Sequence, residues 1–441
     1  MFSKKQIWQL MIPLMVEQLL TVTVGIADSM MVSVAGEAAV SGVSLVDSLN
    51  NLILGIMAAL ATGGAVVCSQ YIGKRQKENA CQAANQLLLT SVVLALLITG
   101  IMLLGGRGLL QLIFGSTETT VMDHAFIYTV IIVLTYPFMA VYNSAAALFR
   151  SMGNSRISML VSILMNAINI SLNAVLIFGF HMGVAGAAAA TLAARIVGSI
   201  LMLSMIRQQK HEIHIADLQK IRPNLFMIRR ILYIGIPTGL ENGMFQMGRI
   251  LVLSLAASFG TVSIMANAVA GSLCAFMIIP GTAVSLAMVT IVGQCIGAER
   301  VDLARRYTNL LLLLSVAMIG VVSAVIVLLR PFLLGLYHMS PEAYEIANRL
   351  MFWHFILGTF MWPLAFNLPN ALRAGNDVKY TMTVSMLSMW ICRVAFSYLL
   401  ARRFELGLYG IWIAMFTDWL ARIVCFVVRY RDNRWCQKRL I

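Results

Sequence analysis

Acidic side chains lie inside long apolar stretches of the sequence, where a charge is costly to bury. Asp28 lies about 18 residues into the first stretch, and Glu17 precedes it by 11 residues, which is three turns of a helix. Both carboxylates therefore project from nearly the same helix face. An ion within a membrane-spanning helix costs about 2.5–3.5 kcal/mol, so these acids are candidates for binding a cation. The alternative is that Asp28 stays protonated and only accepts hydrogen bonds.

Asparagine amides are the expected partners of Asp28. Asn166, Asn169 and Asn173 follow one another at spacings of three and four, which places them along one stripe of a helix. Amide oxygens can bind Na⁺ directly or hydrogen-bond a carboxylate, whereas a proton needs only Asp28. We therefore expect H⁺ or Na⁺ as the ion bound at this cluster. Any sodium site would be formed by Asp28, Asn169 and Asn173. The alternative is that the stripe, Asn166 above all, only joins helices through bonds worth about 0.6 kcal/mol each.

Two further acids are related by their sequence context. Glu17 and Glu241 each follow a proline by four residues, and a proline both frees a backbone carbonyl and bends its helix. This pattern predicts coupling acids near a central cavity or, equally, a pair of solvated acids at the cytosolic side. Asp47, near the outer end of the next apolar stretch, is interpreted as solvated or as a helix cap.

Basic and aromatic residues of the later stretches have structural and binding interpretations. Arg393, Asp418 and Arg422 are expected to form a packed ion network, because Asp418 and Arg422 are one helical turn apart. Thioethers adapt to varied ligands, and ring faces attract cations by roughly 0.5–2 kcal/mol. The 29 Met residues and one aromatic run therefore suit a substrate cavity for a lipophilic cation, with these candidates: Phe352, Trp353, Phe360 and Trp362.

The composition indicates which elements carry these residues. Of 441 residues, 60% are hydrophobic and 11% are charged, and the mean hydropathy is +0.85. Continuous apolar runs of about 18 or more residues predict membrane-spanning helices rather than the alternating strands of a barrel. We expect an all-α polytopic membrane protein with twelve spans, near residues 8–34, 40–70, 82–105, 123–149, 157–180, 183–206, 229–258, 263–295, 305–329, 342–371, 378–400 and 407–428.

Basic residues indicate the two sides of the membrane. About 23 of the 32 Lys and Arg lie at the two ends and in alternate loops, and about four lie in the opposite loops. The positive-inside rule then places both termini in the cytosol. The expected location is the plasma (inner) membrane. The net charge of +14 does not indicate nucleic-acid binding, because the basic residues are spread among loops. The expected partners are a small-molecule substrate and membrane lipid, with the protein as a monomer.

The sequence repeats itself with an offset of 224 residues. "IPLMVEQ" matches "IPTGLEN", and "SQYIG" matches "GQCIG", at this one offset. Six spans per half place both copies the same way up in the membrane, as in transporters that bind substrate between two rocking lobes. We expect a first lobe over 1–207, a cytosolic linker over 208–228 and a second lobe over 229–441.

Motifs of several enzyme classes are absent from the sequence. It contains no GxxxxGK[ST] phosphate loop and no HExxH, and its seven cysteines show no CxxC or Cys/His pattern. We therefore expect neither an enzyme nor a cofactor other than the coupling ion. The classes that remain are an ion-driven carrier, a lipid flippase and a channel.

Several motifs resemble those of one known family. "GIADSMMVSVAGEAAVSGVSLVDSL", "SQYIGKRQKENA", "FRSMGNSR" and "NISLNAVLIFG" are similar to motifs of the multidrug and toxic compound extrusion (MATE) family, along essentially the whole chain. The resemblance implies a V-shaped, twelve-helix antiporter that exports amphipathic, often cationic, compounds in exchange for Na⁺ or H⁺. It also implies that the family's cation site falls on Asp28, on Asn169 to Asn173, and on Thr191. Some members carry an aspartate where this chain has Asn173.

Two other transport classes are weighed against this antiporter. A flippase for lipid-linked oligosaccharide would share the same broad superfold. Such proteins tend to have more spans and a cavity lined with Arg or Lys, whereas the spans here hold few cations. A channel would need a ring of pore-lining charges rather than two repeated lobes. The flippase is therefore the second hypothesis, and the channel the third.

Overall fold

Helices account for the apolar stretches of the chain. The computed structural model describes residues 2–34, 36–115, 119–215, 222–337 and 339–436. Long apolar segments fold as helices because a helix satisfies its own backbone groups where water is absent. Within these ranges no strand is present, and nine helices are long and apolar enough to span a membrane, or ten if one bent pair is a single span. The expected all-α polytopic class is confirmed.

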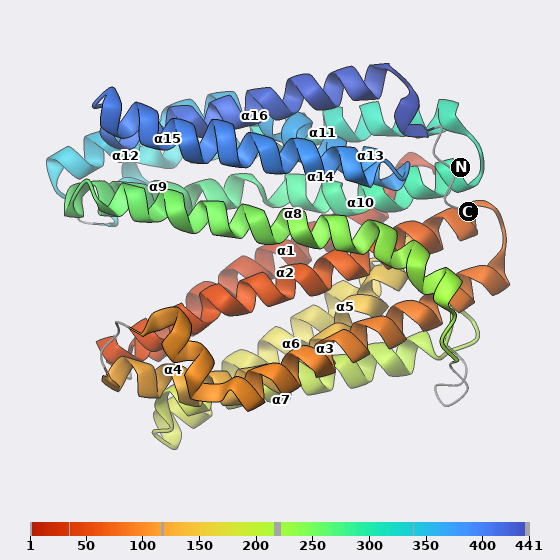
Figure 1. Ribbon diagram of the computed structural model, residues 1–441, viewed down its shortest axis with the longest axis horizontal. Helices are drawn as coiled ribbons and strands as arrows, with labels where there is room; N and C mark the ends of the chain where they lie inside the picture. Colours follow the sequence, from red (N-terminus) through yellow and green to blue (C-terminus); the bar gives the residue numbers. More distant parts are fainter. Residues whose placement is uncertain (1, 35, 116–118, 216–221, 338, 437–441) are drawn as a thin grey trace. The chain divides into compact units, whose positions relative to one another are not determined.

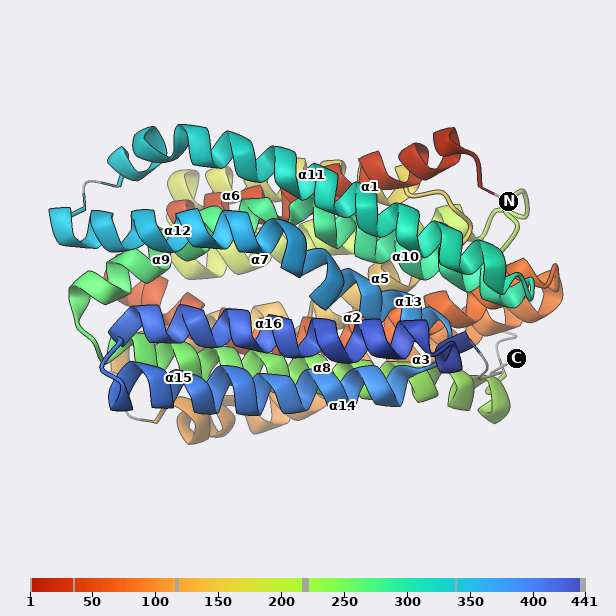
Figure 2. The same cartoon turned by 90° about the horizontal axis from the view of Figure 1, so that it is seen from above.

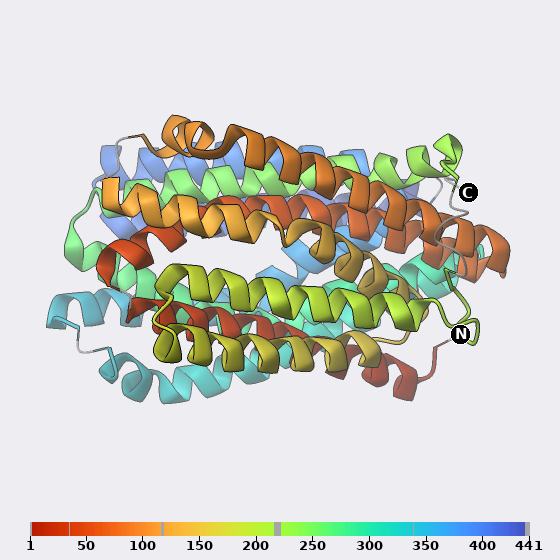
Figure 3. The same ribbon diagram turned by 90° about the horizontal axis from the view of Figure 1, so that it is seen from below.

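The amino-terminal half forms the first of two compact units, Phe2–Gly239. Its helices before the start of α8 are Lys4–Ser33 (α1), Glu37–Gly73 (α2), Lys77–Phe114 (α3), Thr119–Val133 (α4), Tyr136–Ser151 (α5), Arg156–Asn173 (α6), the π-helical Ala174–Gly179 (η1) and Gly183–Ile206 (α7). Figure 3 shows α6 and α7, the yellow-green pair, lying side by side. α1 packs along α6, and α2 packs against α3, α4 and α5.

The carboxy-terminal half forms the second unit, Leu240–Ile441. Its helices are Leu225–Ala257 (α8, which contains the boundary), Thr261–Met277 (α9), Ile279–Gly297 (α10), Val301–Gly335 (α11), Pro341–Trp362 (α12), Pro363–Asn367 (η3), Leu368–Ala374 (α13), Val378–Leu387 (α14), Ser388–Ala395 (η4), Phe396–Tyr398 (α15), Leu399–Arg403 (η5), Gly407–Arg431 (α16) and Arg434–Cys436 (η6). α16 runs beside the α14–α15 segment, both blue in Figures 1 and 2. Of the expected linker and basic tail, residues 216–221 and 437–441 lie outside the described part.

The 224-residue offset is also present in the backbone. α2 and α9 begin 224 residues apart, and so do α3 and α11, and α7 and α16. Gly36 and its repeat mate Gly260 both precede a helix, with φ of 101° and 92°, a conformation that favours glycine. Arg75 and Glu299, also repeat mates, have φ of 58° and 57°. The repeat predicted from the sequence is therefore confirmed.

The two copies differ where proline interrupts a helix. α2 is one helix of 37 residues, whereas its counterpart is divided into α9 and α10 at Ile278. Pro280 explains this break, because proline lacks the N–H donor that a continuous helix needs. Pro137 likewise follows the break between α4 and α5, which are bent by 49°. The bend leaves Thr135, the N-cap residue of α5, with a side chain that can receive a bond from another helix.

Gly63 marks a close approach of α2 to α8 within the amino-terminal unit. A Cβ at Gly63 would lie 2.6 Å from the Ile231 carbonyl oxygen and 2.9 Å from the Gly235 nitrogen. We expect Gly63→Ala to lower the free energy of unfolding by about 1–3 kcal/mol, because backbone atoms cannot move aside cheaply. Gly100→Ala is the matched control, since a Cβ there meets nothing within 4 Å. Denaturant titration of both purified variants measures the difference, and equal losses would contradict the close approach.

Candidate functional site

A chain of hydrogen bonds joins Asp28 to the asparagines of α6. Asn173 Nδ2 donates to Asp28 Oδ1 at 2.7 Å and to Asn169 Oδ1 at 3.2 Å. Asn169 Nδ2 in turn donates to Thr191 Oγ1 at 3.1 Å. Asn169 and Asn173 are buried, and Asp28 is half-buried. The structure therefore brings together four of the candidate cation-site residues, from α1, α6 and α7.

The local sequence explains why these amides meet the carboxylate. The spacing of four residues aligns Asn169 and Asn173 on one face of α6. The wider turn η1 begins at Ala174, and π-helical turns of this kind recur at functional sites. Asn173 Oδ1 is buried and has no hydrogen-bond partner among the described residues, so a neutral oxygen is available beside the carboxylate. Asn166 does not join this set, since its buried Nδ2 finds no partner in the described part either.

A second group of charged and polar residues lies beside Asp28. Tyr128 of α4 donates from its hydroxyl to Asp47 Oδ1 of α2 at 3.2 Å. Arg195 of α7 donates from NH1 to Thr135 Oγ1 at 2.6 Å. It also interacts electrostatically with both Asp28 and Asp47. With both carboxylates ionised, the two acids and one guanidinium carry a net charge of −1, which one monovalent cation would balance.

Sequence reasoning misses Arg195 and misinterprets Asp47. Asp47 lies well inside α2, so its interpretation as a helix cap is wrong; its side chain is half-buried and accepts a bond from Tyr128. Arg195 goes unnoticed when basic residues are used only to assign the sides of the membrane. Its position in the middle of an apolar helix is the signal that identifies it, because a guanidinium there is costly unless it has a role.

Glu17 and Glu241 each lie against an arginine. Arg373 NH2 donates to both carboxylate oxygens of Glu241 at 2.7 Å, and Glu17 Oε1 lies 3.8 Å from Arg150 NH1. Both glutamates are only 8% exposed, so their interpretation as solvated acids is wrong. Because each carboxylate already faces a guanidinium, neither supplies the uncompensated charge that a bound cation needs. The structure does not bring either glutamate into the hydrogen-bonded chain of Asp28.

The predicted ion network of the carboxy-terminal unit is confirmed. Asp418 Oδ1 lies 2.8 Å from Arg422 Nε, and Asp418 Oδ2 lies 3.8 Å from Arg393 NH1. Asp418 is completely buried, and a buried carboxylate of this kind needs its arginine partners to offset the cost of leaving water. The network therefore joins α16 to η4 in the interior of the unit.

The aromatic candidates do not share one environment. Three of the four expose between 38% and 62% of their surface: Phe352, Trp353 and Phe360. Trp362 is buried at 7% exposure and stacks on Phe366, with ring centroids 5.2 Å apart. Of the predicted cavity residues, Trp362 is therefore the one that contributes to the interior of the carboxy-terminal unit.

Comparison with known proteins identifies the same repeat. The family model described as MatE matches the chain twice, over residues 13–175 and 237–399. Both ends of the second match lie 224 residues after those of the first. The offset found in the sequence and in the backbone is thus also the offset of the family model, and the two matches together cover most of the chain.

Relatives and solved structures align along almost the whole chain. The transporter YisQ of Bacillus subtilis is 27% identical over 97% of this chain and 94% of its own length. The probable multidrug resistance protein NorM of Thermotoga maritima is also 27% identical, over 99% of this chain and 94% of its own length. An outward-facing multidrug resistance MATE transporter has the same fold, with a TM-score of 0.91, 22% identity and coverage of 99% and 97%. Since the family model matches both repeats, this chain belongs to the MATE family of membrane transporters and is not an enzyme.

Proposed function

We propose that this transporter is a multidrug efflux antiporter that exports amphipathic or cationic small molecules in exchange for H⁺ or Na⁺ bound at Asp28. The observation that carries the proposal is the cluster of Asp28, Asn169 and Asn173, with one uncompensated negative charge among apolar helices. The relatives support the type of cargo, since several are probable multidrug resistance proteins. The protein would act in the plasma membrane as a monomer surrounded by lipid, with both termini in the cytosol.

Cation binding at Asp28 would change the bonds of the neighbouring helices. A cation on the carboxylate competes with the bond from Asn173, and the chain through Asn169 to Thr191 then rearranges. The helices α1, α6 and α7 would repack, and bound substrate would be released outside. The two repeats would alternate between outward and inward access, as in other transporters built from parallel repeats.

Na⁺ and H⁺ differ in the ligand atoms that they need and in the gradient that drives their entry. Na⁺, unlike H⁺, would also use the unpartnered Oδ1 of Asn173 as a ligand. A proton gradient supplies about 1.4 kcal/mol per pH unit, and the membrane potential supplies about 2.3 kcal/mol per charge per 100 mV. One ion exchanged for one monovalent substrate cation moves no net charge, so the potential would not drive that exchange.

Imposing one gradient at a time tests the proposed coupling. Proteoliposomes would be loaded with a fluorescent lipophilic cation and diluted into buffer that imposes only a Na⁺ gradient or only a pH gradient. We expect one of the two gradients to drive export against the substrate gradient. Movement that only follows the substrate gradient, whichever ion is imposed, would contradict antiport and indicate a channel.

Asn173 is expected to matter for coupling and Asn166 is not, although both lie on α6. Asn173→Ala removes the bond, worth about 1.5–3 kcal/mol, that links the Asp28 carboxylate to the chain through Asn169. Ion binding then no longer rearranges this chain, so ion-driven export should fall at least about tenfold. Asn166→Ala should change the rate less than about twofold, because its amide nitrogen makes no bond in the described part. Rates in the same proteoliposomes measure both variants. Similar rates would show that the stripe acts only as helix packing.

A further inference from the structure

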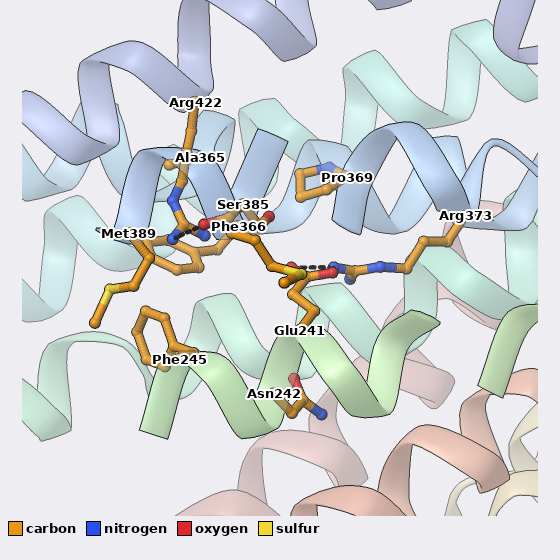
Figure 4. Close-up of a pocket in the computed structure, with 11 residues that line it drawn as sticks. Glu241, Asn242, Phe245, Ala365, Phe366, Pro369, Arg373, Ser385, Met389 and Arg422 are labelled. Atoms are coloured by element: carbon orange, nitrogen blue, oxygen red, sulfur yellow. Dashed lines mark hydrogen bonds and ion pairs between the residues drawn. The ribbon is translucent and has the colours of Figure 1, made fainter. Parts of the chain in front are cut away.

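The carboxy-terminal unit contains a polar cavity that is lined by none of the residues of the Asp28 cluster. It has a volume of about 180 Å³ and lies among α8, η3, α13, α14 and α16. Figure 4 shows its residues, with Glu241 and Phe245 on α8, Arg373 on α13, Ser385 on α14 and Arg422 on α16. An engineered apolar cavity of about 150 Å³ binds benzene. This cavity is therefore large enough for a single aromatic ring with a small substituent.

Aromatic rings form part of the cavity wall. Phe245 and Phe366 both line it, with ring centroids 6.4 Å apart and planes at 81°. The Cζ atom of Arg422 lies 5.6 Å from the ring centroid of Phe245 and 5.3 Å from that of Phe366. Ring edges and faces of this kind pack well against another aromatic ring. The wall is thus suited to a flat, apolar ligand body.

The charges around the cavity do not cancel. Glu241 is matched by Arg373, whose NH2 donates to both of its oxygens. Asp418 is shared between Arg422 and the more distant Arg393. Glu241, Arg373 and Arg422 line the cavity itself, whereas Asp418 and Arg393 lie behind this lining. Counted together, three guanidinium groups and two carboxylates leave one positive charge in excess. The excess points to an anion, since a buried positive charge is costly when unmatched.

Two buried polar groups on the cavity wall also lack partners. Ser385 Oγ and Arg373 Nε make no hydrogen bond within the described residues. Ser385 is 2% exposed and Arg373 is 8% exposed, so the partner of either group must come from inside the cavity that they line. Almost all buried polar groups in proteins are paired, and an unpaired donor calls for an explanation. A ligand that accepts hydrogen bonds would satisfy both groups.

The repeat shows that this polarity is opposite to that of the first half. At the 224-residue offset, Asp28 corresponds to Val252, and Asn169 corresponds to Arg393. At this offset the second copy thus has an apolar residue where the first has its acid, and a guanidinium where the first has an amide. Two other members of the network replace small residues of the first copy: Asp418 corresponds to Ala194 and Arg422 to Gly198.

We propose that the cavity binds the carboxylate of a small aromatic acid, with the carboxylate held by Arg373 and Ser385 and the ring packed against Phe245 and Phe366. Arginine suits this role because its planar donors match carboxylate geometry. This site goes beyond the proposed cation exchange at Asp28 and does not depend on it. It extends the ligands of the transporter from cations to aromatic anions, or to zwitterions that carry both charges.

Equilibrium binding to the purified full-length protein in detergent tests the proposal. The probe is radiolabelled benzoate, and benzamide is the neutral analogue of the same shape. We expect saturable benzoate binding, with benzamide competing at least about tenfold more weakly, because a bond to a charged acceptor is lost. Absence of benzoate binding to folded protein, or equal competition by benzamide, would overturn the proposal.

Variants locate the bound acid within the fold. Ser385→Ala and Arg373→Lys, which keeps the charge opposite Glu241, should each weaken benzoate binding at least about tenfold. Ser397→Ala is the matched control, because Ser397 is equally buried and unpartnered in the described part but does not line the cavity. If Arg373→Lys does not fold, the effect of Ser385→Ala on benzoate binding alone decides whether the acid binds in this cavity. Unchanged binding in Ser385→Ala, or an equal loss in Ser397→Ala, would place the acid elsewhere and reject this site.

Cation exchange at Asp28 and anion binding in the carboxy-terminal cavity can be rejected separately. Ion-driven export of a lipophilic cation without benzoate binding would reject only the anion site. Benzoate binding that depends on Ser385, in a protein that shows no ion-driven export, would reject only the proposed antiport. Both measurements use the same purified full-length chain.

Discussion

Asp28→Asn is expected to reduce ion-driven export by about three orders of magnitude while leaving the protein folded. The amide oxygen can still accept the bond from Asn173, so the local packing is kept. The cluster loses its net negative charge, because Asp47 and Arg195 then balance each other. Two unit charges 4 Å apart interact with about 4 kcal/mol at an effective dielectric constant of 20, which corresponds to nearly a thousandfold in cation affinity. Accumulation of a fluorescent lipophilic cation in inverted vesicles measures the loss.

Asp123→Asn is the matched control for this prediction. Asp123 lies on α4 of the same unit and pairs with Arg107, but both side chains are about half exposed. Pairs of this kind contribute at most about 1 kcal/mol, so export should change less than about twofold. Wild-type accumulation in Asp28→Asn vesicles, with equal amounts of transporter in the membrane, would contradict the assigned role of Asp28.

Asp418→Asn is expected to cause the largest loss of stability. Asp418 is 0% exposed and faces Arg422 and Arg393. Removing its charge leaves two buried guanidiniums without their acid, and breaking a buried pair in this way costs about 3–5 kcal/mol. Denaturant titration of the purified protein, followed by circular dichroism, measures the change in the free energy of unfolding.

Glu345→Gln provides the comparison for Asp418→Asn. Glu345 also pairs with an arginine one turn away, Arg349, but both side chains are more than 60% exposed. Glu345→Gln should lower the free energy of unfolding by less than about 1 kcal/mol, because exposed pairs are screened by water. If Asp418→Asn were as stable as Glu345→Gln, the network would not be the tightly packed element described here.

Features encoded by local spacing could be predicted from the sequence. The expected ranges of the twelve spans fall on helices or on consecutive helices because apolar runs of this length are visible in the chain. The bond between Asn169 and Asn173 and the pair of Asp418 with Arg422 follow from a separation of one helical turn. The repeat could be found because its matching residues share one offset.

Contacts between distant segments could not be predicted in the same way. Tyr128 and Asp47 are 81 residues apart, and Arg373 and Glu241 are 132 apart, so no periodicity relates them. Glu241 could therefore be interpreted as solvated although it is buried. The opposite polarity of the second unit also depends on packing, because Arg393 meets Asp418 only once η4 lies against α16.

The most direct test of the central claim is to measure the counter-ion itself. Proteoliposomes loaded with substrate would be diluted into buffer containing ²²Na⁺, or a pH-sensitive dye would be trapped inside, and ion entry would be recorded with and without substrate. We predict substrate-dependent entry of one of the two ions into wild-type vesicles and none into Asp28→Asn vesicles. Equal substrate-dependent ion entry through Asp28→Asn would show that the exchanged ion binds somewhere other than this carboxylate.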